Sequence, residues 1–353
     1  MNVSHRLSEN QYLVTYNVGS GESGSRIDNF LKSRYHRRSR EQIKRALDSG
    51  AISIIRTSSQ VGKIKPSSTV MLGDQVHVMT ERKEEPEVNF NYKILFEDET
   101  LFIVEKPSNL PVHPAGKYFF NTLTTHLKTQ GFKTPLNDDV DFYLAHRIDK
   151  ETSGVLVLSK DKEVSQKLAA QFADRTTEKT YLAITHGRIE KDEFSVDVPI
   201  GRDPNAPVTL KMAPLALEAG GQTAATKFKV IERRGNFTLV ECYPKTGRQH
   251  QIRVHLDHVG HPIVGDKLYG IEVDTALTLF ERRMPSASQN TLTSMQFQTA
   301  MEISPEVMEK LILPRHALHA AGIKFSHPIT GKRVEFRSGL PEDLQAFFDT
   351  ITI

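Results

Sequence analysis

Hydrophobic positions recur with two different periods along the chain, and these periods predict both helices and strands. Val164, Leu168 and Phe172 lie four residues apart, which is the spacing of an amphipathic helix. Residues 101–105, which are apolar as far as Val104, and the continuously apolar residues 155–158 are expected to be buried strands. Further candidate strands cover 179–187, 226–234 and 237–244. Because strands and helices mix without regular alternation, the pattern favours an α+β fold over a doubly wound parallel sheet.

The same pattern divides the chain into segments. The N-terminal stretch is polar and rich in glycine and serine, so we expect a flexible arm. It is followed by two predicted helices, the second capped by Ser39 and ended at Gly50, and by short strands. A charged, proline-containing linker then leads to a larger domain. The predicted boundaries are 1–25 for the arm, 26–80 for the helix pair and small sheet, 81–91 for the linker, and 92–353 for the larger domain, with an insertion at about 271–315.

Composition narrows the class of protein. The 353 residues are 38% hydrophobic and 25% charged, which is ordinary for a soluble globular protein. No apolar run reaches the length of a membrane span, and the N-terminus lacks the apolar core of a signal peptide. The single cysteine, Cys242, excludes an intramolecular disulfide and a cysteine-clustered zinc site. We therefore expect a cytoplasmic protein without membrane contact, and a monomer by default.

Positive charge is concentrated in the predicted helix pair. The net charge of the whole chain is only +3, but residues 26–50 hold eight Lys or Arg against three Asp or Glu, a local net charge of +5. Such a surface attracts a polyanion, most simply nucleic acid. A solvated helix face is the alternative interpretation. The residues we expect to contact RNA here are Arg37, Arg38, Arg40, Lys44 and Arg45.

Two stretches combine charged residues with sharp turns beside predicted buried elements. In "AHRIDKETSGVLVLSK", residues 145–160, Asp149 stands before a Thr-Ser-Gly turn and a buried strand. A carboxylate there can act as nucleophile, base or ligand, although a lone aspartate at a strand end is more often a turn residue. In "GRQHQIRVHLDHVGHPIVGDKLYG", residues 247–270, Arg248 and Arg253 lie in or just before a predicted helix.

Histidines in the second stretch raise the question of a metal. His250, His255, His258 and His261 match no zinc spacing, because the chain offers no HExxH pattern and no cysteine partner. Polar helix-face histidines, some of them contacting RNA phosphate, are the favoured interpretation.

Two further stretches complete the set of candidates. "EKPSNLPVHP", residues 105–114, places Lys106 at a strand end, where it could meet phosphate or lie on the surface. "EKTYLAITHG", residues 178–187, places Tyr181 in a strand, as a core residue or as a platform for a base.

Together these four stretches, with "LHAAGIKFSHPITGKRVEF" at 318–336, resemble the RluA-type pseudouridine synthases over about residues 92–340. The resemblance implies a mixed, mainly antiparallel sheet with flanking helices and an RNA-binding cleft. It also implies isomerisation of uridine to pseudouridine without a cofactor, in structured RNA, most usually large-subunit ribosomal RNA, with transfer RNA as the alternative. "RIDNFL", "SREQIKRALDSGAISI", "KPSSTV" and "GDQVHV" resemble an S4-like RNA-binding domain, although "SIIRT" replaces the usual Val-Asn-Gly.

The resemblance also implies roles for individual residues. Asp149 would be the catalytic nucleophile or base, and Arg253 would keep it ionised. Arg147 would occupy the position vacated by a flipped uridine, and Tyr181 would stack on the extruded base. His146 would support the loop or a phosphate. Arg248, His250 and Lys106 are further candidates for RNA contacts.

Two other functions are left open by the sequence. One is a catalytically silent RNA-binding or ribosome-assembly factor on the same fold, which loss of Asp149 or Arg253 would have favoured. The other is an N-glycoside hydrolase, a class that generally uses a second carboxylate or an activated water. No clear partner acid accompanies Asp149 in the sequence.

Overall fold

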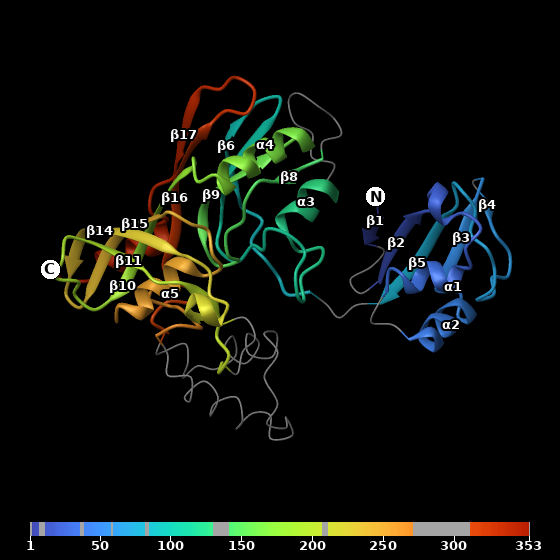
Figure 1. Cartoon of the computed structure of the whole chain (residues 1–353), viewed down its shortest axis with the longest axis horizontal. Helices are drawn as coiled ribbons and strands as arrows, with labels where there is room; N and C mark the ends of the chain where they lie inside the picture. Colours follow the sequence, from blue (N-terminus) through green and yellow to red (C-terminus); the bar gives the residue numbers. More distant parts are fainter. Residues whose placement is uncertain are drawn as a thin grey trace. The chain divides into compact units, whose positions relative to one another are not determined.

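The computed structural model describes residues 2–6, 11–35, 39–57, 59–81, 85–129, 141–206, 211–270 and 311–352. The chain forms two compact units, Met1–Glu85 and Pro86–Ile353, and each is described by itself (Figure 1). Arg37, Arg38 and most of the predicted insertion, residues 271–310, lie outside the described residues.

The N-terminal unit is a five-stranded antiparallel sheet with two helices. Ser39 caps the second helix as predicted, because its hydroxyl accepts the backbone N–H of Gln42 at 3.2 Å. Leu31 and Ile43 from the helices pack with Val76 of the sheet in one buried core. The sheet order is β1-β2-β5-β3-β4, and the elements are β1 (Asn2–Arg6), β2 (Gln11–Asn17), α1 (Ile27–Lys32), α2 (Arg40–Asp48), β3 (Ile52–Arg56), β4 (Ser59–Gln60) and β5 (Gln75–Glu81).

The N-terminal arm is the part of this unit that differs from expectation. Residues 11–17, expected to be flexible, form β2 and pair with β5 along their whole length. Tyr12 and Tyr16 are 2% and 6% exposed, so the aromatic positions of this short stretch are buried by the sheet. The prediction of a flexible arm was wrong for β2, because the glycine- and serine-rich residues 18–25 that follow this strand suggested a loop.

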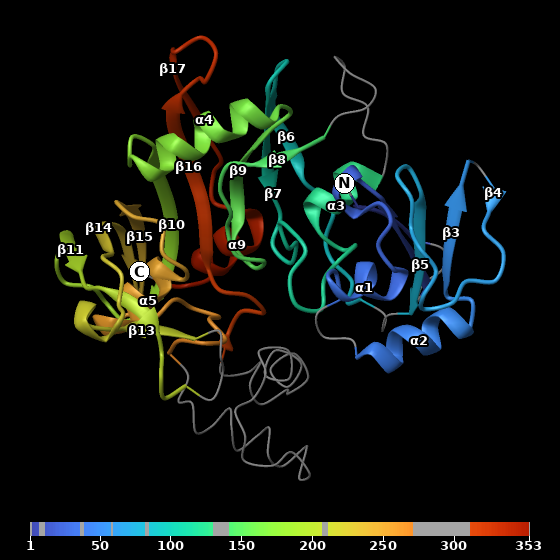
Figure 2. The ribbon, with the colours of Figure 1, turned by 45° about the vertical axis from the view of Figure 1, so that its right-hand side comes forward.

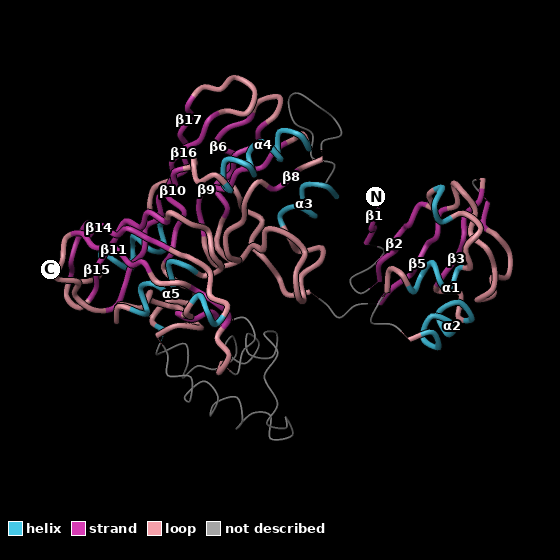
Figure 3. Tube along the Cα trace, viewed as in Figure 1, coloured by secondary structure: helices cyan, strands magenta, loops and turns pink. Residues whose placement is uncertain are grey.

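The larger unit contains a ten-stranded sheet in the order β11-β14-β15-β10-β16-β9-β7-β6, with β17 paired to β16 and β8 to β9. All pairs are antiparallel except β9 with β16. A mainly antiparallel sheet with separate helices confirms the α+β class, and Figure 3 shows the helices and strands of this unit. Its strands are β6 (Lys93–Glu97), β7 (Leu101–Lys106), β8 (Tyr143–Leu144), β9 (Ser153–Ser159), β10 (Glu178–His186), β11 (Glu193–Asp197), β14 (Ala225–Arg234), β15 (Phe237–Pro244), β16 (Leu318–Ser326) and β17 (Arg333–Arg337), beside a separate pair, β12 (Ile200–Arg202) and β13 (Met212–Pro214). Its helices are α3 (Leu123–Thr129), α4 (Lys162–Ala173), α5 (Gln251–His258) and α9 (Glu342–Asp349).

Helices cover both faces of the half of the sheet that contains β7 and β9. Successive strand residues point to opposite faces. Val157 of β9 packs with Leu168 of α4 on one face, whereas Leu156 packs with Leu123 of α3 on the other. Figure 2 shows α4 lying across this sheet. The continuous apolar run of β9 is thus explained by burial on both sides.

The other half of the sheet, β10-β15-β14, has one face covered by α5. Phe228 of β14 and Val240 of β15 pack with Ile252 of α5 in one cluster. Phe237 of β15 points to the opposite face, where its ring lies 5.5 Å from that of Phe347 of α9, so α9 covers the end of that face near the β14–β15 turn. The strands of this half therefore alternate between a face buried under α5 and a face that is open beyond α9.

The two halves of the sheet meet at the short parallel pairing of β9 with β16, which we call the seam. It consists of Ser153 beside His319 and Gly154 beside Ala320. Gly154 has φ 112°, and a Cβ there would lie 2.2 Å from the carbonyl oxygen of Ala320. Only glycine allows this close approach of two backbones.

No helix in the described ranges is long and apolar enough to cross a membrane.

Candidate active site

Asp149 lies in the loop between β8 and β9, directly before the seam. Its backbone carbonyl accepts the N–H of Thr152 at 3.2 Å, and the Thr152 hydroxyl lies 2.8 Å from Nε2 of His316. The next residue, Ser153, hydrogen-bonds His319 of β16 at 2.9 Å. Buried side chains of β16 and of the residues just before it thus fix the loop on the C-terminal side of Asp149.

Lys106 fixes the same loop from the end of β7. Its ammonium donates to the backbone carbonyls of Pro107, Leu110 and Lys150 at 2.8–3.0 Å, and the residue is 0% exposed. Burial lowers the pKa of Lys106 to about 7. Because all three N–H groups of an ammonium have acceptors here, the prediction that Lys106 meets RNA phosphate is wrong. Lys106 instead holds the backbone beneath the Asp149 loop.

Arg253, in the first turn of α5, joins two carboxylates. Its Nη1 donates to Oδ2 of Asp149 at 3.0 Å, while its Nε and Nη2 donate to Oδ2 and Oδ1 of Asp266 at 2.6 and 2.8 Å. The side chains of Arg253 and Asp266 are 6% and 0% exposed, whereas that of Asp149 is 33% exposed. The guanidinium is therefore held from behind by Asp266 and presents one N–H to the accessible carboxylate.

The position of Asp266 is in turn fixed by backbone groups, and an aromatic ring lies against Arg253. Its Oδ1 accepts the N–H groups of Leu268 and Tyr269 at 2.9 and 3.2 Å. The Tyr269 ring lies 5.0 Å from the guanidinium carbon of Arg253, and its hydroxyl lies 3.0 Å from Nδ1 of His250. These contacts leave Arg253 little freedom to move.

The pKa of Asp149 reflects opposing effects. Burial by itself would raise it, but the charges of His250 and Arg253 and the hydrogen bond from Arg253 hold the pKa well below its usual range. The Nε2 atom of His250 lies 4.0 Å from Asp149, but His250 lowers the pKa of Asp149 only when it is protonated itself. Burial lowers the pKa of His250 to about 4. At neutral pH, Arg253 is therefore the cation that keeps Asp149 ionised.

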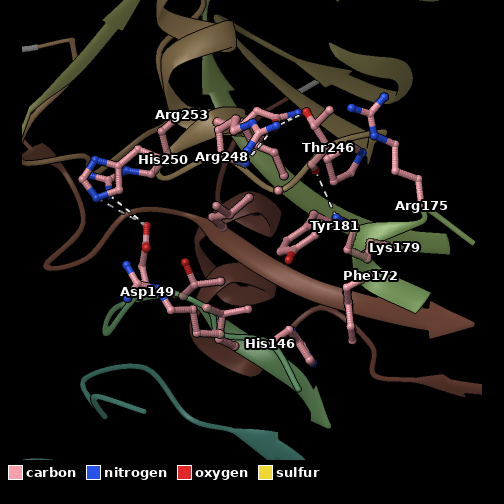
Figure 4. A pocket seen from close by; sticks show the side chains of 18 of the residues that line it. His146, Asp149, Phe172, Arg175, Lys179, Tyr181, Thr246, Arg248, His250 and Arg253 are labelled. Carbon is pink, nitrogen blue, oxygen red and sulfur yellow. Dashed lines mark hydrogen bonds and ion pairs between the residues drawn. The ribbon is translucent and has the colours of Figure 1, made fainter. Parts of the chain in front are cut away.

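A pocket of about 510 Å³ opens beside Asp149 (Figure 4). Tyr181 of β10 lies near its centre, between Asp149 and the side chains of Phe172 and Lys179. Burial, followed by the charge of Asp149, raises the pKa of Tyr181, so its hydroxyl stays neutral. The volume and the mixture of apolar and charged walls are typical of a small-molecule or nucleobase pocket.

The other predicted residues of the larger unit fall into two groups. Arg147 and Arg248 line the pocket, and Arg147 is exposed, with no hydrogen bond or ion pair in the part of the chain that the structure describes. His146 instead supports the loop, because its Nε2 accepts the N–H of Val157 at 3.0 Å and its ring stacks on Phe172. Burial lowers the pKa of His146 to about 3.

The remaining predicted contacts belong to the N-terminal unit. Arg40, Lys44 and Arg45 are exposed on α2, and Arg45 forms an ion pair with Glu41 at 2.5 Å.

Of the other histidines of the larger unit, His255 is buried between Thr226 and the carbonyl of Val198, so it does not contact RNA.

Asp266, Tyr269, Lys179 and His316 were not identified from the sequence. Asp266 and Tyr269 stand in "GDKLYG", at the end of the stretch 247–270 that also contains Arg253. Asp266 follows Arg253 by 13 residues and was detectable as a partner for its guanidinium. His316 gave no signal, because only the fold brings the residues before β16 to Thr152. Across the described ranges, no group of three histidine, cysteine, aspartate or glutamate residues could hold a metal ion.

Known proteins resemble this chain along most of its length. The family model for RNA pseudouridylate synthase matches residues 100–258. The chain is 33% identical over 337 residues to ribosomal large subunit pseudouridine synthase D of Zymomonas mobilis, covering 94% of this chain and 95% of the relative. It is 31% identical to the protein of the same name from Pseudomonas aeruginosa, covering 91% and 90%. It is 30% identical to the uncharacterized RNA pseudouridine synthase YlyB of Bacillus subtilis, covering 94% and 95%.

A solved structure shares the fold. Human RNA pseudouridylate synthase domain containing 1 aligns with a TM-score of 0.51 at 23% identity, covering 72% of this chain and 86% of its own. Because the sequence similarity extends along nearly the whole length of several relatives, the chain belongs to the RluA family of RNA pseudouridine synthases, isomerases that act on RNA.

Proposed function

We propose that this enzyme isomerises uridines of large-subunit ribosomal RNA, with Asp149 as the catalytic carboxylate. The names of the Zymomonas and Pseudomonas relatives support the choice of RNA. The observation that carries the catalytic role is the ion pair between Asp149 and Arg253, backed by Asp266. It provides an ionised, accessible carboxylate in a pocket large enough for a base.

The reaction needs no redox partner. The bond from uracil N1 to ribose C1′ breaks, the uracil turns within the pocket, and C5 bonds to C1′. The proton on C5 is then lost and N1 gains one, so the atoms of the nucleotide are conserved. A carboxylate can serve this sequence by attacking the ribose, by attacking the uracil ring, or by removing the 2′ proton.

All three routes require a free lone pair on Asp149. Arg253 donates to Oδ2, and His250 faces the same oxygen. Within the described ranges, no hydrogen bond to Oδ1 is formed, so this oxygen is the reactive atom in the proposal. Arg253 holds Asp149 in its ionised form and limits its rotation.

Access to Asp149 requires that the uridine leave its helix. Unstacking costs a few kcal/mol. In the proposal, Tyr181 stacks on the extruded base, which returns about 1–3 kcal/mol. Arg147, exposed at the rim and free of protein partners in the described structure, takes the vacated position in the RNA.

The N-terminal unit is proposed to be an S4-like domain that binds structured RNA through α2. Its exposed cations support this role. In the variant Arg40→Gln/Lys44→Gln, the affinity for a ribosomal RNA transcript should fall, and the slope of log Kd against log salt concentration should decrease by one to two units, about one for each phosphate that is no longer neutralised. Filter binding at several salt concentrations measures both, and an unchanged slope would show that α2 is not a binding surface.

The catalytic assignment is tested by Asp149→Asn. Asparagine keeps the shape of the side chain but removes its charge and its nucleophilicity, so isomerisation should fall by at least about a thousandfold. The assay is tritium release from large-subunit ribosomal RNA labelled at uridine C5, with wild type in parallel.

RNA affinity measured on the same proteins separates catalysis from binding. It should stay within a few fold of wild type, because Asp149 makes no phosphate contact in this proposal. Retained turnover in Asp149→Asn would refute the role of Asp149. Free uracil in the wild-type reaction would instead indicate glycosidic hydrolysis.

A further inference from the structure

A second hollow, of about 580 Å³, lies on the face of the sheet opposite α5. We call it the β14–β17 groove. One row of residues on neighbouring strands crosses its floor. Lys227 of β14 lies beside Tyr243 of β15. Thr180 of β10 lies beside Gly322 of β16, and Gly322 pairs in turn with Arg337 of β17. Five strands at about 4.8 Å spacing give the row a length of about 19 Å.

The shape of the groove follows from its residue types. Gly322, the fourth of the five residues in the row, has no side chain and leaves room above the floor beside Arg337. Tyr243 provides an aromatic ring among cations, a combination typical of single-stranded RNA surfaces.

Positive charge prevails along the walls. Among the residues that line the groove, seven cations face three carboxylates, which leaves a net charge of +4. Lys227 pairs with Glu193 at 2.7 Å, while Lys324 and Arg337 share Glu335. Lys229 and Lys245 are exposed and form no ion pair with any described residue. The cations are Arg175, Lys179, Lys227, Lys229, Lys245, Lys324 and Arg337.

The groove adjoins the active-site pocket. Arg175, Lys179 and Pro244 line both hollows. Lys179 is fixed at this junction, because its ammonium donates to the carbonyl of Thr246 at 3.0 Å. Arg175 is exposed and has no bonded partner for its guanidinium among the described side chains (Figure 4).

Arg175 occupies a backbone position that favours glycine. It follows the end of α4 with φ 60°, in the left-handed region. The N–H of Thr176 bonds the carbonyl of Gln171, and that of Arg175 bonds the carbonyl of Phe172, which together form a Schellman motif. An arginine in the place usually taken by glycine strains the backbone, and such strain is concentrated at functional sites.

We propose that the β14–β17 groove binds the RNA strand that flanks the target uridine, through its phosphodiester backbone. In this arrangement Arg175 holds the phosphate at the junction, where the strand passes from the groove to the pocket. The inference rests on the proposed function, since it requires a target uridine at Asp149. It adds a recognition surface outside the pocket itself.

The variant Arg175→Gly tests the junction without weakening the fold. Glycine adopts φ 60° at no steric cost, so the urea midpoint of unfolding should equal or exceed that of wild type. The Kd for large-subunit ribosomal RNA, transcribed in vitro, should rise about three- to tenfold. The slope of log Kd against log salt concentration should decrease by about one unit, because the variant neutralises one phosphate fewer.

A second variant tests the groove away from the junction. In Lys229→Gln/Lys245→Gln, two exposed cations are removed and no ion pair is broken, so the salt slope should decrease by about two units. Lys332→Gln is the matched control, because Lys332 is exposed in the β16–β17 turn and lines neither hollow. It should bind RNA like wild type.

The outcomes separate the two proposals. Wild-type Kd and salt slope in both groove variants, with tritium release intact, would overturn the groove and leave the catalytic assignment standing. Absence of tritium release by wild type, in any RNA offered, would contradict the proposed function itself and remove the basis for the groove.

Discussion

Arg253 interacts with two carboxylates that have different surroundings. This difference determines which of the two contacts a substitution of Arg253 can keep. Asp266 is fully buried and binds the guanidinium through two N–H groups, whereas Asp149 is one-third exposed and binds through one. A lysine carries the same charge but has no planar fork. It can reach one carboxylate well, but not both in the observed geometry.

For Arg253→Lys we therefore expect a large loss of rate with little loss of RNA binding. The single-turnover rate should fall at least about a hundredfold, since misplacing a group by about 1 Å costs that much. KM should stay within a few fold of wild type. Rapid-quench kinetics on labelled ribosomal RNA give both values, and a near-normal rate would mean that charge alone, without the fork, keeps Asp149 active.

At the scale of strands and helices, Gly154 controls how closely the two halves of the sheet approach. A Cβ at this position would lie 2.2 Å from the carbonyl oxygen and 2.7 Å from the backbone nitrogen of Ala320. Gly154→Ala should therefore lower the free energy of unfolding by about 3 kcal/mol or more, by clash and by strain at φ 112°. Urea unfolding of the full chain measures this change.

Gly322→Ala is the matched control for that prediction. A Cβ there would meet its neighbours at 3.5 Å or more, which is ordinary contact. The free energy of unfolding should change by less than about 1 kcal/mol. Equal effects of the two substitutions would contradict the importance of the seam.

Elements with a clear period were predicted well from the sequence. Strands β7, β9, β10, β14 and β15 and helices α4 and α5 occur where the patterns placed them, because each has one or two faces that must be buried. Strand β2 was missed because glycine and serine follow it closely, and β8 because it has two residues. These depend on pairing with β5 and β9, which local sequence does not specify.

The sequence singled out residues that the fold brings together, but it did not indicate all of their surroundings. Asp149, Arg253 and Tyr181 lie around one pocket, as expected. Lys106 was misassigned because a lysine after a strand gives no sign of three buried carbonyls converging on it. Those carbonyls come from residues up to 44 positions away, so only the folded chain brings them together.

At the scale of the whole molecule, buried histidines make the larger unit sensitive to acid. Burial lowers the pKa of His316 and His319 to about 4, as it does for His250, from an ordinary value near 6.5. Between these values the unfolded chain binds protons that the folded chain does not. The free energy of unfolding should therefore fall as the pH drops from 6.5 to 4, by up to about 3 kcal/mol for each histidine.

Urea unfolding at pH 7, 6 and 5 tests this dependence. His316→Gln removes one of the titrating groups and should reduce the slope of unfolding free energy against pH. His258→Gln, at an exposed position, is the control and should leave it unchanged. A flat profile from pH 7 to 5 would show that these histidines are protonated at little cost.

The seam also has a consequence for how this protein can vary among related species. Asp149 belongs to one half of the sheet and Arg253 to the other, and two residue pairs of β9 and β16 join these halves. Lengthening the β16–β17 turn would leave that registration untouched. A single residue inserted between Asp149 and Gly154 would displace the carboxylate of Asp149 from the guanidinium of Arg253. Insertions among related proteins should therefore occur at the far ends of the strands and be rare in this short loop.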